Sequence, residues 1–436
     1  MRKRNGISVR LTLALVLAGV SASGCSSTAG NGTPAADSDD SAKNGKPGNT
    51  PVELTVVGTV LAEDEFAKFV AEPMRQKFPA TTIHYVQKTA AQLSDLVTAN
   101  QPIDLYMDGV LNLVNFQDLR LDYDLTNLVK QQHFDLSRVQ SDYITALADG
   151  TGRKDMIGLP IFGLNFALFY NKTVFDRFAV PYPKDGMTWE QARDLAVRLT
   201  RNESGVQYYG LWADNVYRGA YQLGLSWVDT ASNKALFQTI AWKELFSFWY
   251  DLHKAIGYAP KGVNMTKEFT DGRLAMMAGS TTQAATFAKL QDLDWDVVAY
   301  PQNSKAPGVG QRINGFYLLL TNTGKNKEAA FRVIDTVLSN EVQKSMSRNT
   351  RISVLNDVGT QNELGKDIPA LAGKNMAAFT KLKTAKMYTL GNVNAATFVN
   401  NAFNDVLYSG KDINTAINAA QEATDKALQD LKKKGE

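Results

Sequence analysis

Short apolar runs alternate along the chain with longer stretches in which apolar residues recur every three or four positions. Residues 54–57 form one short run, which predicts a strand. Phe66, Phe69, Val70 and Met74 follow at helical spacing, after three acidic residues that suit the positive end of a helix dipole. Elements that alternate in this way predict an α/β fold.

The helical spacing returns several times in the rest of the chain. Thr188 and Gln191 stand three residues apart before an apolar stripe, which is typical of a capping box at the start of a helix. Apolar stripes predict helices over residues 192–199, 242–252, 331–338 and 413–431. We expect four tryptophans to pack inside these elements and the strand-like residues 295–300: Trp189, Trp242, Trp249 and Trp295.

The first 25 residues have the layout of a secretory signal. Basic residues at positions 2, 3, 4 and 10 precede an apolar run over 11–20, and small residues lead to Cys25. Because a run of about ten apolar residues is too short to span a bilayer, residues 1–24 are expected to be a cleaved signal peptide. Cys25 resembles the lipidated cysteine of bacterial lipoproteins, although Ala22 stands where their motif usually has Leu. The alternative is an unmodified thiol.

Residues 26–50 contain only Ser, Thr, Ala, Gly, Asn, Asp, Pro and Lys. No large apolar side chain there offsets the entropy lost when a backbone becomes ordered. We expect a disordered linker that reaches roughly 25–30 Å between the cysteine and the folded body. A disordered terminus without a spacer role fits the same residues.

The calculated charge depends on the signal segment. The chain has 47 Lys and Arg against 44 Asp and Glu, and four of the basic residues lie in residues 1–24, which leaves 43 against 44. A basic footprint on the folded body is therefore not expected, and neither is a nucleic-acid partner. Cys25 has no second cysteine to pair with. The remaining 386 residues exceed one typical core, so two lobes are expected.

The sequence gives little support to an enzyme. His84, His133 and His253 lie far apart, without another His or Cys at ligand spacing, so no metal site is expected. Phosphate-binding, dinucleotide-binding and nucleophile-elbow motifs are also missing, and we expect no cofactor. Acidic pairs such as Asp292 and Asp294 occur, but a glycosidase needs two acids at a defined distance across its substrate, which a sequence does not specify, so catalysis stays open without support from the residues.

Aromatic residues gather in one part of the chain. Between Val206 and Tyr250, 12 of 45 residues are aromatic, and four of the six tryptophans lie there. Sugars need flat faces for stacking together with polar groups for hydrogen bonds. Trp212, Tyr217, Tyr221 and Trp227 follow no regular period and are interleaved with Asp214, Asn215, Arg218 and Asp229, so this stretch is the first candidate for a ligand site.

Five motifs, in order, resemble those of the extracellular solute-binding proteins of ABC importers, the family that includes maltose- and multiple-sugar-binding proteins. They are Gly158-Leu159-Pro160 with Leu168–Lys172, Met187–Glu190, Tyr209-Gly210-Leu211, Phe269–Met276 and Asn326–Phe331. The resemblance implies a two-lobed, periplasmic-binding-protein-like α/β fold with discontinuous lobes and a hinged ligand cleft. It places residues 51–161 and 273–322 in lobe 1, and residues 162–272 and 323–436 in lobe 2.

The resemblance also implies ligand contacts. In the second lobe it points to Trp212, Asp214, Tyr217, Arg218 and Trp227. Elsewhere it points to Asp108, Phe162, Asn165, Ser280, Thr281, Gly315 and Phe316. Asp108 is alternatively a turn residue before Gly109, and Gly315 alternatively marks a strand bulge. Leu164 stands where the family often has a carboxylate or an aromatic residue, and the frequent Trp after Gly279 is missing, which indicates a smaller or more polar pocket.

The expected function is therefore capture of a small ligand, a carbohydrate, by a monomeric lipid-anchored protein on the outer face of the cell membrane. The lobes would close on the sugar and deliver it to the membrane subunits of an ABC permease. Three alternatives stay open: a binding protein for a non-sugar solute, a sensor lipoprotein and an extracellular polysaccharide-processing enzyme.

Overall fold

The computed structural model describes residues 51–435, apart from 230, 258, 260, 387–392 and 394. The signal peptide, Cys25 and the linker predicted over 26–50 lie outside the described residues. Within the described part of the chain, no helix has both the length and the apolar character needed to cross a membrane.

The first lobe is built on a five-stranded mixed sheet in the order β2-β1-β3-β13-β4. β1 runs parallel to β2 and β3, whereas β13 is antiparallel to β3 and β4. The strands are β1 (Val52–Gly58), β2 (Thr81–Val86), β3 (Leu105–Gly109), β4 (Gly158–Leu164) and β13 (Asn314–Leu320). The helices around it are α1 (Glu63–Phe66), α2 (Glu72–Lys77), α3 (Leu93–Thr98), α4 (Val114–Asp118), α5 (Thr126–Gln131), α6 (Ser141–Thr151), α13 (Lys327–Val337), α14 (Asn340–Arg348) and α15 (Val358–Gln361).

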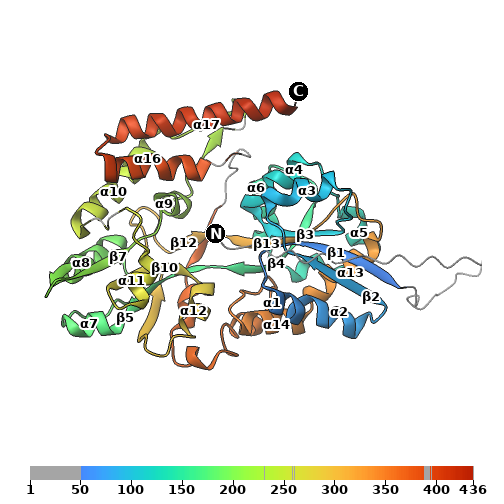
Figure 1. Cartoon of the computed structure of the whole chain (residues 1–436), viewed down its shortest axis with the longest axis horizontal. Helices are drawn as coiled ribbons and strands as arrows, with labels where there is room; N and C mark the ends of the chain where they lie inside the picture. The colour runs from blue at the N-terminus through green and yellow to red at the C-terminus, as the bar shows by residue number, and fades with distance from the viewer. Residues whose placement is uncertain are drawn as a thin grey trace, which may run out of the picture. The chain divides into compact units, whose positions relative to one another are not determined.

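The second lobe is built on another five-stranded sheet, in the order β11-β5-β10-β7-β6 (Figure 1). Its strands are β5 (Phe166–Asn171), β6 (Arg201–Glu203), β7 (Val206–Trp212), β10 (Leu274–Ser280) and β11 (Trp295–Ala299). Its helices are α7 (Lys172–Arg177), α8 (Trp189–Leu199), α9 (Val216–Gln222), α10 (Ile240–Ile256), α11 (Met265–Thr270), α12 (Thr281–Phe287), α16 (Ala395–Ser409) and α17 (Ile413–Gly435). Two short strand pairs join β8 (Val228–Asp229) to β9 (Lys234–Ala235) and β12 (Val309–Arg312) to β14 (Lys383–Ala385).

The apolar pattern predicted many of these elements correctly. The strand predicted at 54–57 is β1, and Phe66, Phe69, Val70 and Met74 are buried on one helical segment whose middle turn is a π-helix over Ala67–Ala71. The four tryptophans expected in packing roles are buried. The Thr188 hydroxyl accepts a hydrogen bond from Gln191 N, and the Gln191 side-chain oxygen accepts one from Thr188 N, which confirms the capping box of α8.

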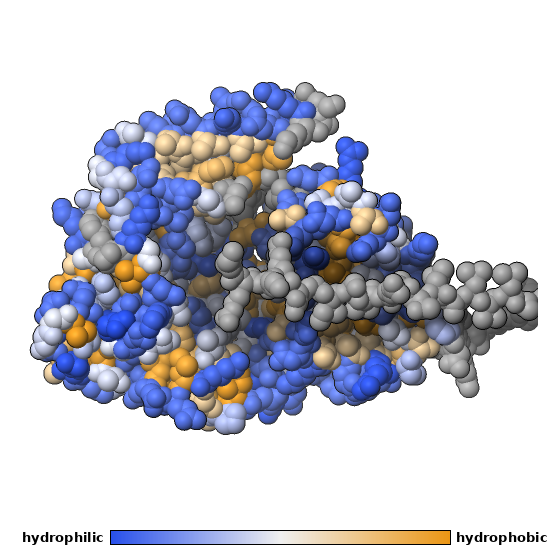
Figure 2. Space-filling model, in the orientation of Figure 1, coloured by the Kyte–Doolittle hydropathy of each residue, from blue (hydrophilic) through white to orange (hydrophobic). Residues whose placement is uncertain are grey.

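The C-terminal amphipathic helix is also confirmed. Ala416, Ile417, Ala420 and Leu428 of α17 are buried and belong to the core of the second lobe. In Figure 2 the outer edge of α17 is hydrophilic, and apolar residues gather beneath it over α16. The packing of α16 against α17 therefore has the one-sided pattern that the sequence predicts.

The predicted lobe boundaries are wrong in two places. Residues 273–322 were expected in lobe 1, but β10 pairs with β5 and β7, and β11 pairs with β5, so both strands belong to the second sheet. Residues from 323 onward were expected in lobe 2, but α13, α14 and residues 354–355 bury their apolar side chains in the core of the first lobe. Strand pairing decides the position of β10 and β11, and core packing decides that of α13 and α14. Sequence periodicity specifies neither.

The chain passes between the lobes at two adjacent strand junctions, and a third time between Leu355 in the core of the first lobe and Leu371 in the second. β4 leads into β5 through Asn165, and β12 leads into β13 through Ile313. The two junctions lie side by side, because Asn314 pairs with Leu164 and Gly315 with Gly163. A fold of two sheets joined through such narrow connections can bend at them.

Candidate functional site

A cavity with a volume of about 540 Å³ opens between the described parts of the two sheets. This is within the range of small-molecule sites in proteins. Residues of both lobes line it, which makes it a cleft between the lobes. The lining residues are Ala90, Leu111, Asn112 and Asn115 from the first lobe, Tyr217, Arg218, Tyr221, Val393, Ala396, Thr397 and Asn400 from the second, and Arg312 and Asn314 from the junction.

On the second lobe, the start of α9 positions Arg218. Asp214 precedes the helix with a φ of 68°, and its carboxylate accepts hydrogen bonds from both nitrogens of Asn215 at 2.8 Å. The same carboxylate accepts one from Arg218 Nε at 2.9 Å, one helical turn later. The Arg218 guanidinium lies 3.9 Å from the centre of the Phe166 ring. Burial opposes the charge of Arg218, but Asp214 together with Tyr217 and Tyr300 raises the pKa of the guanidinium on balance.

Two tyrosines of α9 give the cleft its aromatic surface. Tyr217 and Tyr221 are four residues apart and therefore share one face of the helix, with their ring centres 5.5 Å apart in an edge-to-face arrangement. Burial raises the pKa of Tyr217. The Tyr221 side chain is buried, and no described residue lies within hydrogen-bond geometry of its hydroxyl. Aromatic faces and an open hydroxyl of this kind suit a polar ligand that also has apolar faces.

Arg312 enters the cleft from the junction between the lobes. Its Nη1 donates a hydrogen bond to the Ile313 carbonyl at 2.8 Å, and its guanidinium lies 4.5 Å from the centre of the Tyr221 ring. Burial lowers the pKa of Arg312. Gln311, beside it, donates to the Arg218 carbonyl at 3.0 Å and so connects the junction to α9.

On the first lobe, Asp108 orients a residue of the cleft. Its Oδ1 accepts hydrogen bonds from Gly109 N at 2.7 Å and Asn112 Nδ2 at 2.9 Å, and its Oδ2 accepts one from the Tyr106 hydroxyl at 2.7 Å. Asp108 is buried at the end of β3, whereas Asn112 lines the cavity. Asp108 thus fixes the amide that faces the cleft, and its bond to Gly109 N favours the interpretation of Asp108 as a turn residue.

The structure places only some of the residues named by the resemblance on the cavity. Tyr217 and Arg218 line it, and Asp108 and Asp214 each bind a residue that does. Phe162 and Phe316 stack on each other with ring centres 4.8 Å apart, and the Trp212 ring packs against the core around Phe169. Trp227, which is 1% exposed, lies in the core between Tyr221 and Trp242.

The remaining residues that the resemblance names make contacts within the protein, near the junction between the lobes. Asn165 Nδ2 donates to the Phe379 carbonyl at 2.7 Å, and its carbonyl accepts from Thr281 N. Ser280 caps α12 and Thr281 is fully buried. Gly315 leaves no room for a side chain, because a Cβ there would lie 2.6 Å from the Tyr317 hydroxyl, and the register shifts between Phe316 and Tyr317. The strand-bulge interpretation of this segment is therefore the one that the pairing favours.

Sequence reasoning missed several lining residues. Asn112 and Arg312 were not singled out, and neither was the group on α16 formed by Ala396, Thr397 and Asn400. The only signal for that group was its mixture of small and polar residues at helical spacing, which is also the pattern of a solvated helix face.

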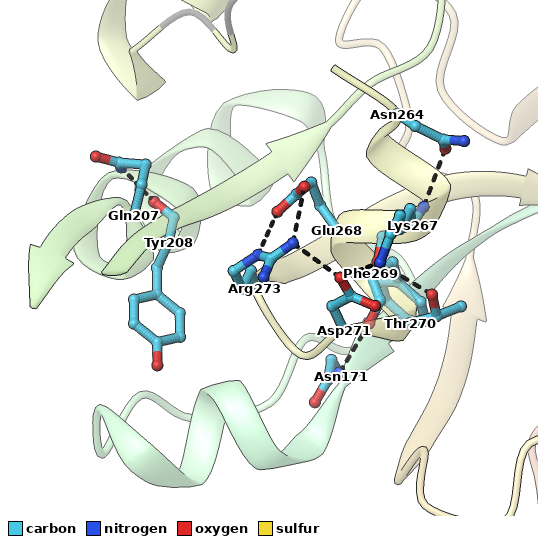
Figure 3. Close-up of polar contacts among 10 residues, drawn as sticks. All are labelled: Asn171, Gln207, Tyr208, Asn264, Lys267, Glu268, Phe269, Thr270, Asp271 and Arg273. Carbon is cyan, nitrogen blue, oxygen red and sulfur yellow. Dashed lines mark hydrogen bonds and ion pairs between the residues drawn. The ribbon is translucent and has the colours of Figure 1, made fainter. Parts of the chain in front are cut away.

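The motif over Phe269–Met276 has a structural role (Figure 3). Gly272 has a φ of 72° and turns the chain from α11 into β10. Arg273 pairs with Glu268 at 2.6 Å and with Asp271 at 2.8 Å, and Asn171 donates to the Phe269 carbonyl at 3.2 Å. The turn is therefore held by its own side chains, beneath the sheet of the second lobe. Across the described parts of 51–435, no group of three acidic, His or Cys side chains is suitably arranged to hold a metal ion.

Comparison with known families identifies the class of protein. The model of the bacterial extracellular solute-binding protein family matches residues 46–372. The chain belongs to this family. The family places this solute-binding protein outside the cytoplasm, with a solute as its ligand. No protein with a curated description matches the sequence significantly.

Solved structures share the fold of this solute-binding protein at low sequence identity. The ABC substrate-binding protein of Listeria monocytogenes in complex with cycloalternan has 17% identity and a TM-score of 0.72, over 87% of this chain and 99% of that one. The sugar-binding protein MalE of Xanthomonas citri has 16% identity and a TM-score of 0.70, over 87% and 98%. The cyclic α-maltosyl-1,6-maltose binding protein of Arthrobacter globiformis has 16% identity and a TM-score of 0.69, over 87% and 100%. These structures support the two-lobed α/β fold.

Proposed function

We propose that this solute-binding protein captures a carbohydrate in the cleft between its lobes and delivers it to the membrane subunits of an ABC importer. The observation that carries the proposal is the composition of the cleft: two tyrosine rings beside amide, hydroxyl and guanidinium groups from both lobes. Sugars present apolar faces and hydroxyl edges, which this combination can stack against and hydrogen-bond. The Listeria protein in complex with cycloalternan and the cyclic α-maltosyl-1,6-maltose binding protein of Arthrobacter, which share the fold, support the same class of ligand.

Closure of the lobes is the proposed mechanism. A ligand can favour the closed form only through contacts that improve on closure, so groups from both lobes must touch it. Asn112 and Asn115 would bind from the first lobe, and Tyr217 and Arg218 from the second. With roughly 1 kcal/mol for each good hydrogen bond and a similar amount for stacking, several contacts together reach the ~8 kcal/mol of micromolar binding.

The test is a thermal-shift screen over monosaccharides and oligosaccharides, with product analysis of the same wells. A bound sugar should raise Tm by several degrees near saturation, without turnover. Tyr217→Ala should lose most of the shift, whereas Tyr408→Ala, an exposed tyrosine of α16 outside the cavity lining, should keep it. A shift that survives in Tyr217→Ala would place the ligand elsewhere, and turnover would indicate an enzyme instead.

We further propose that the protein acts as a monomer anchored by a lipid on Cys25. The basic, apolar and small-residue regions before Cys25 support this proposal, because a diacylglyceryl cysteine supplies the two chains that stable anchoring needs. In the native host, Cys25→Ser should move the protein from the membrane fraction to the medium. Retention of the variant in the membrane fraction would contradict the anchor.

A further inference from the structure

The cleft has an excess of positive charge. Two of its lining residues, Arg218 and Arg312, carry guanidinium groups, and no acidic residue is among the described residues that line it. The adjacent carboxylate of Asp214 is bound to Arg218 Nε. The described lining of the cleft therefore carries more cationic than anionic groups.

Arg218 is prepared to bind a further acceptor. Its Nε is taken by Asp214 and its plane lies over the Phe166 ring, so the orientation of the guanidinium is set from two sides. Among the described residues, none accepts a hydrogen bond from its two terminal nitrogens. A guanidinium held in this way presents a pair of parallel donors, which matches the two oxygens of a carboxylate.

The partners around Arg218 also favour a ligand rich in acceptors. Arginine side chains only donate, and the Asn side chains of the cleft supply amide oxygens as acceptors in place of carboxylates. An ionised carboxyl group on a sugar only accepts hydrogen bonds, whereas each hydroxyl both donates and accepts.

We propose that the ligand is an acidic saccharide, a uronic acid or an oligomer of uronic acids, whose carboxylate binds the terminal nitrogens of Arg218. This proposal rests on the carbohydrate capture proposed above and narrows it to one class of sugar. The Tyr217 and Tyr221 rings would contact the apolar face of the same sugar, and the Tyr221 hydroxyl would gain a partner.

The test is calorimetric titration of the whole protein with sugars that differ only in the carboxylate. Galacturonate is compared with galactose, glucuronate with glucose, and oligogalacturonides with their methyl esters. Each acid should bind at least tenfold more tightly than its neutral partner, and added salt should reduce the difference. Acetate at the same concentration should give no binding heat.

Paired variants separate the role of Arg218 from a general charge effect. The double variant Asp214→Asn/Arg218→Gln removes the ion pair without a change in net charge and should abolish the preference for acids. The matched control Arg177→Gln/Glu203→Gln removes an exposed pair of the same lobe, 2.7 Å apart, and should keep the preference. Circular dichroism checks that both variants fold, and the comparison of acids with neutral sugars on the unaltered protein does not depend on either.

The outcomes distinguish the two proposals. If neutral sugars bind as tightly as their acids, or more tightly, the acidic ligand is wrong while carbohydrate capture stands. If acetate binds as the uronates do, the site recognises free carboxylates and the saccharide is wrong. If no sugar of either kind binds, the proposed function itself fails.

Discussion

At the scale of single residues, Asp108 stabilises the first lobe and also orients a side chain of the cleft. Three donors converge on its buried carboxylate, and one of them belongs to Asn112. Asp108→Asn replaces an acceptor by a donor, so at least one buried donor loses its partner. We expect the free energy of unfolding to fall by about 2 kcal/mol and ligand affinity to fall with it.

Urea denaturation and calorimetry of the same preparations measure the two effects. Asn112→Ala is the control: it keeps the bonds of Asp108 to Tyr106 and Gly109, so it should change affinity more than stability. If Asp108→Asn lowers affinity with stability unchanged, Asp108 contacts the ligand itself.

His253 gives a second prediction at this scale. Burial lowers its pKa, outweighing the bond between its Nδ1 and the Trp249 carbonyl at 2.7 Å. In the unfolded chain His253 takes up a proton near pH 6.5, whereas in the folded chain its lowered pKa keeps it neutral to a lower pH. The stability that His253 contributes is therefore fully present above pH 6.5, and the free energy of unfolding falls as the pH drops below it. His253→Gln should flatten the fall in unfolding free energy between pH 7 and 5, by at most ~1.4 kcal/mol per pH unit.

Thermal or urea unfolding at several pH values measures that slope. Equal slopes for His253→Gln and the unaltered protein would mean that His253 takes up its proton over the same pH range in the folded and unfolded states.

The sequence predicted only part of the site at this scale. Trp227 and Tyr217 both stand in an irregular aromatic stretch, and the sequence gives no reason to separate them. The structure separates them because α9 is only seven residues long, with Tyr217 and Tyr221 on its cleft side, whereas Trp227 follows the helix and packs on Phe237 and Trp242. A helix of two turns is too short to give a clear period.

At the scale of elements, one glutamine fastens the C-terminal helix to the second lobe. Gln421 of α17 accepts a hydrogen bond from Phe237 N at 2.9 Å and donates one to the Ala235 carbonyl at 2.6 Å. Gln421→Ala leaves a buried N–H and a buried carbonyl without these partners. We expect a loss of about 2 kcal/mol in the free energy of unfolding, measured by urea denaturation.

A matched control comes from the same two segments. Gln238 donates to Asn418 at 3.0 Å in an exposed position, so Gln238→Ala should cost less than ~0.5 kcal/mol. Equal losses in the two variants would show that the backbone groups at 235 and 237 find water when Gln421 is removed.

Elements with a long, regular apolar pattern were predictable, and their arrangement was not. α8, α10, α13 and α17 each bury one face and carry a clear stripe in the sequence. The partners of β10 and β11 depend on contacts with β5, more than 100 residues earlier, and no local pattern specifies them. The lobe boundaries were therefore wrong where local patterning gave no information.

At the scale of the whole molecule, ligand capture requires the lobes to move against each other about the connections between them. Val358 on α15 is 68% exposed, and Ile240 at the start of α10 is 76% exposed, so spin labels on cysteines at these positions report on both lobes without disturbing a core. In a Cys25→Ser background, a bound sugar should shift the distance between the labels by more than about 2 Å.

A second pair of labels separates closure from local change. Val197 of α8 is also exposed and lies in the same lobe as Ile240, so the distance between labels at 197 and 240 should stay constant when the ligand binds. Because the sugar stabilises closure only if both lobes touch it, the Asp214→Asn/Arg218→Gln variant should reduce the shift across the lobes even at saturating ligand. A constant distance across the lobes with ligand bound would mean that the cleft is preformed, and that capture proceeds without bending at residues 165 and 313.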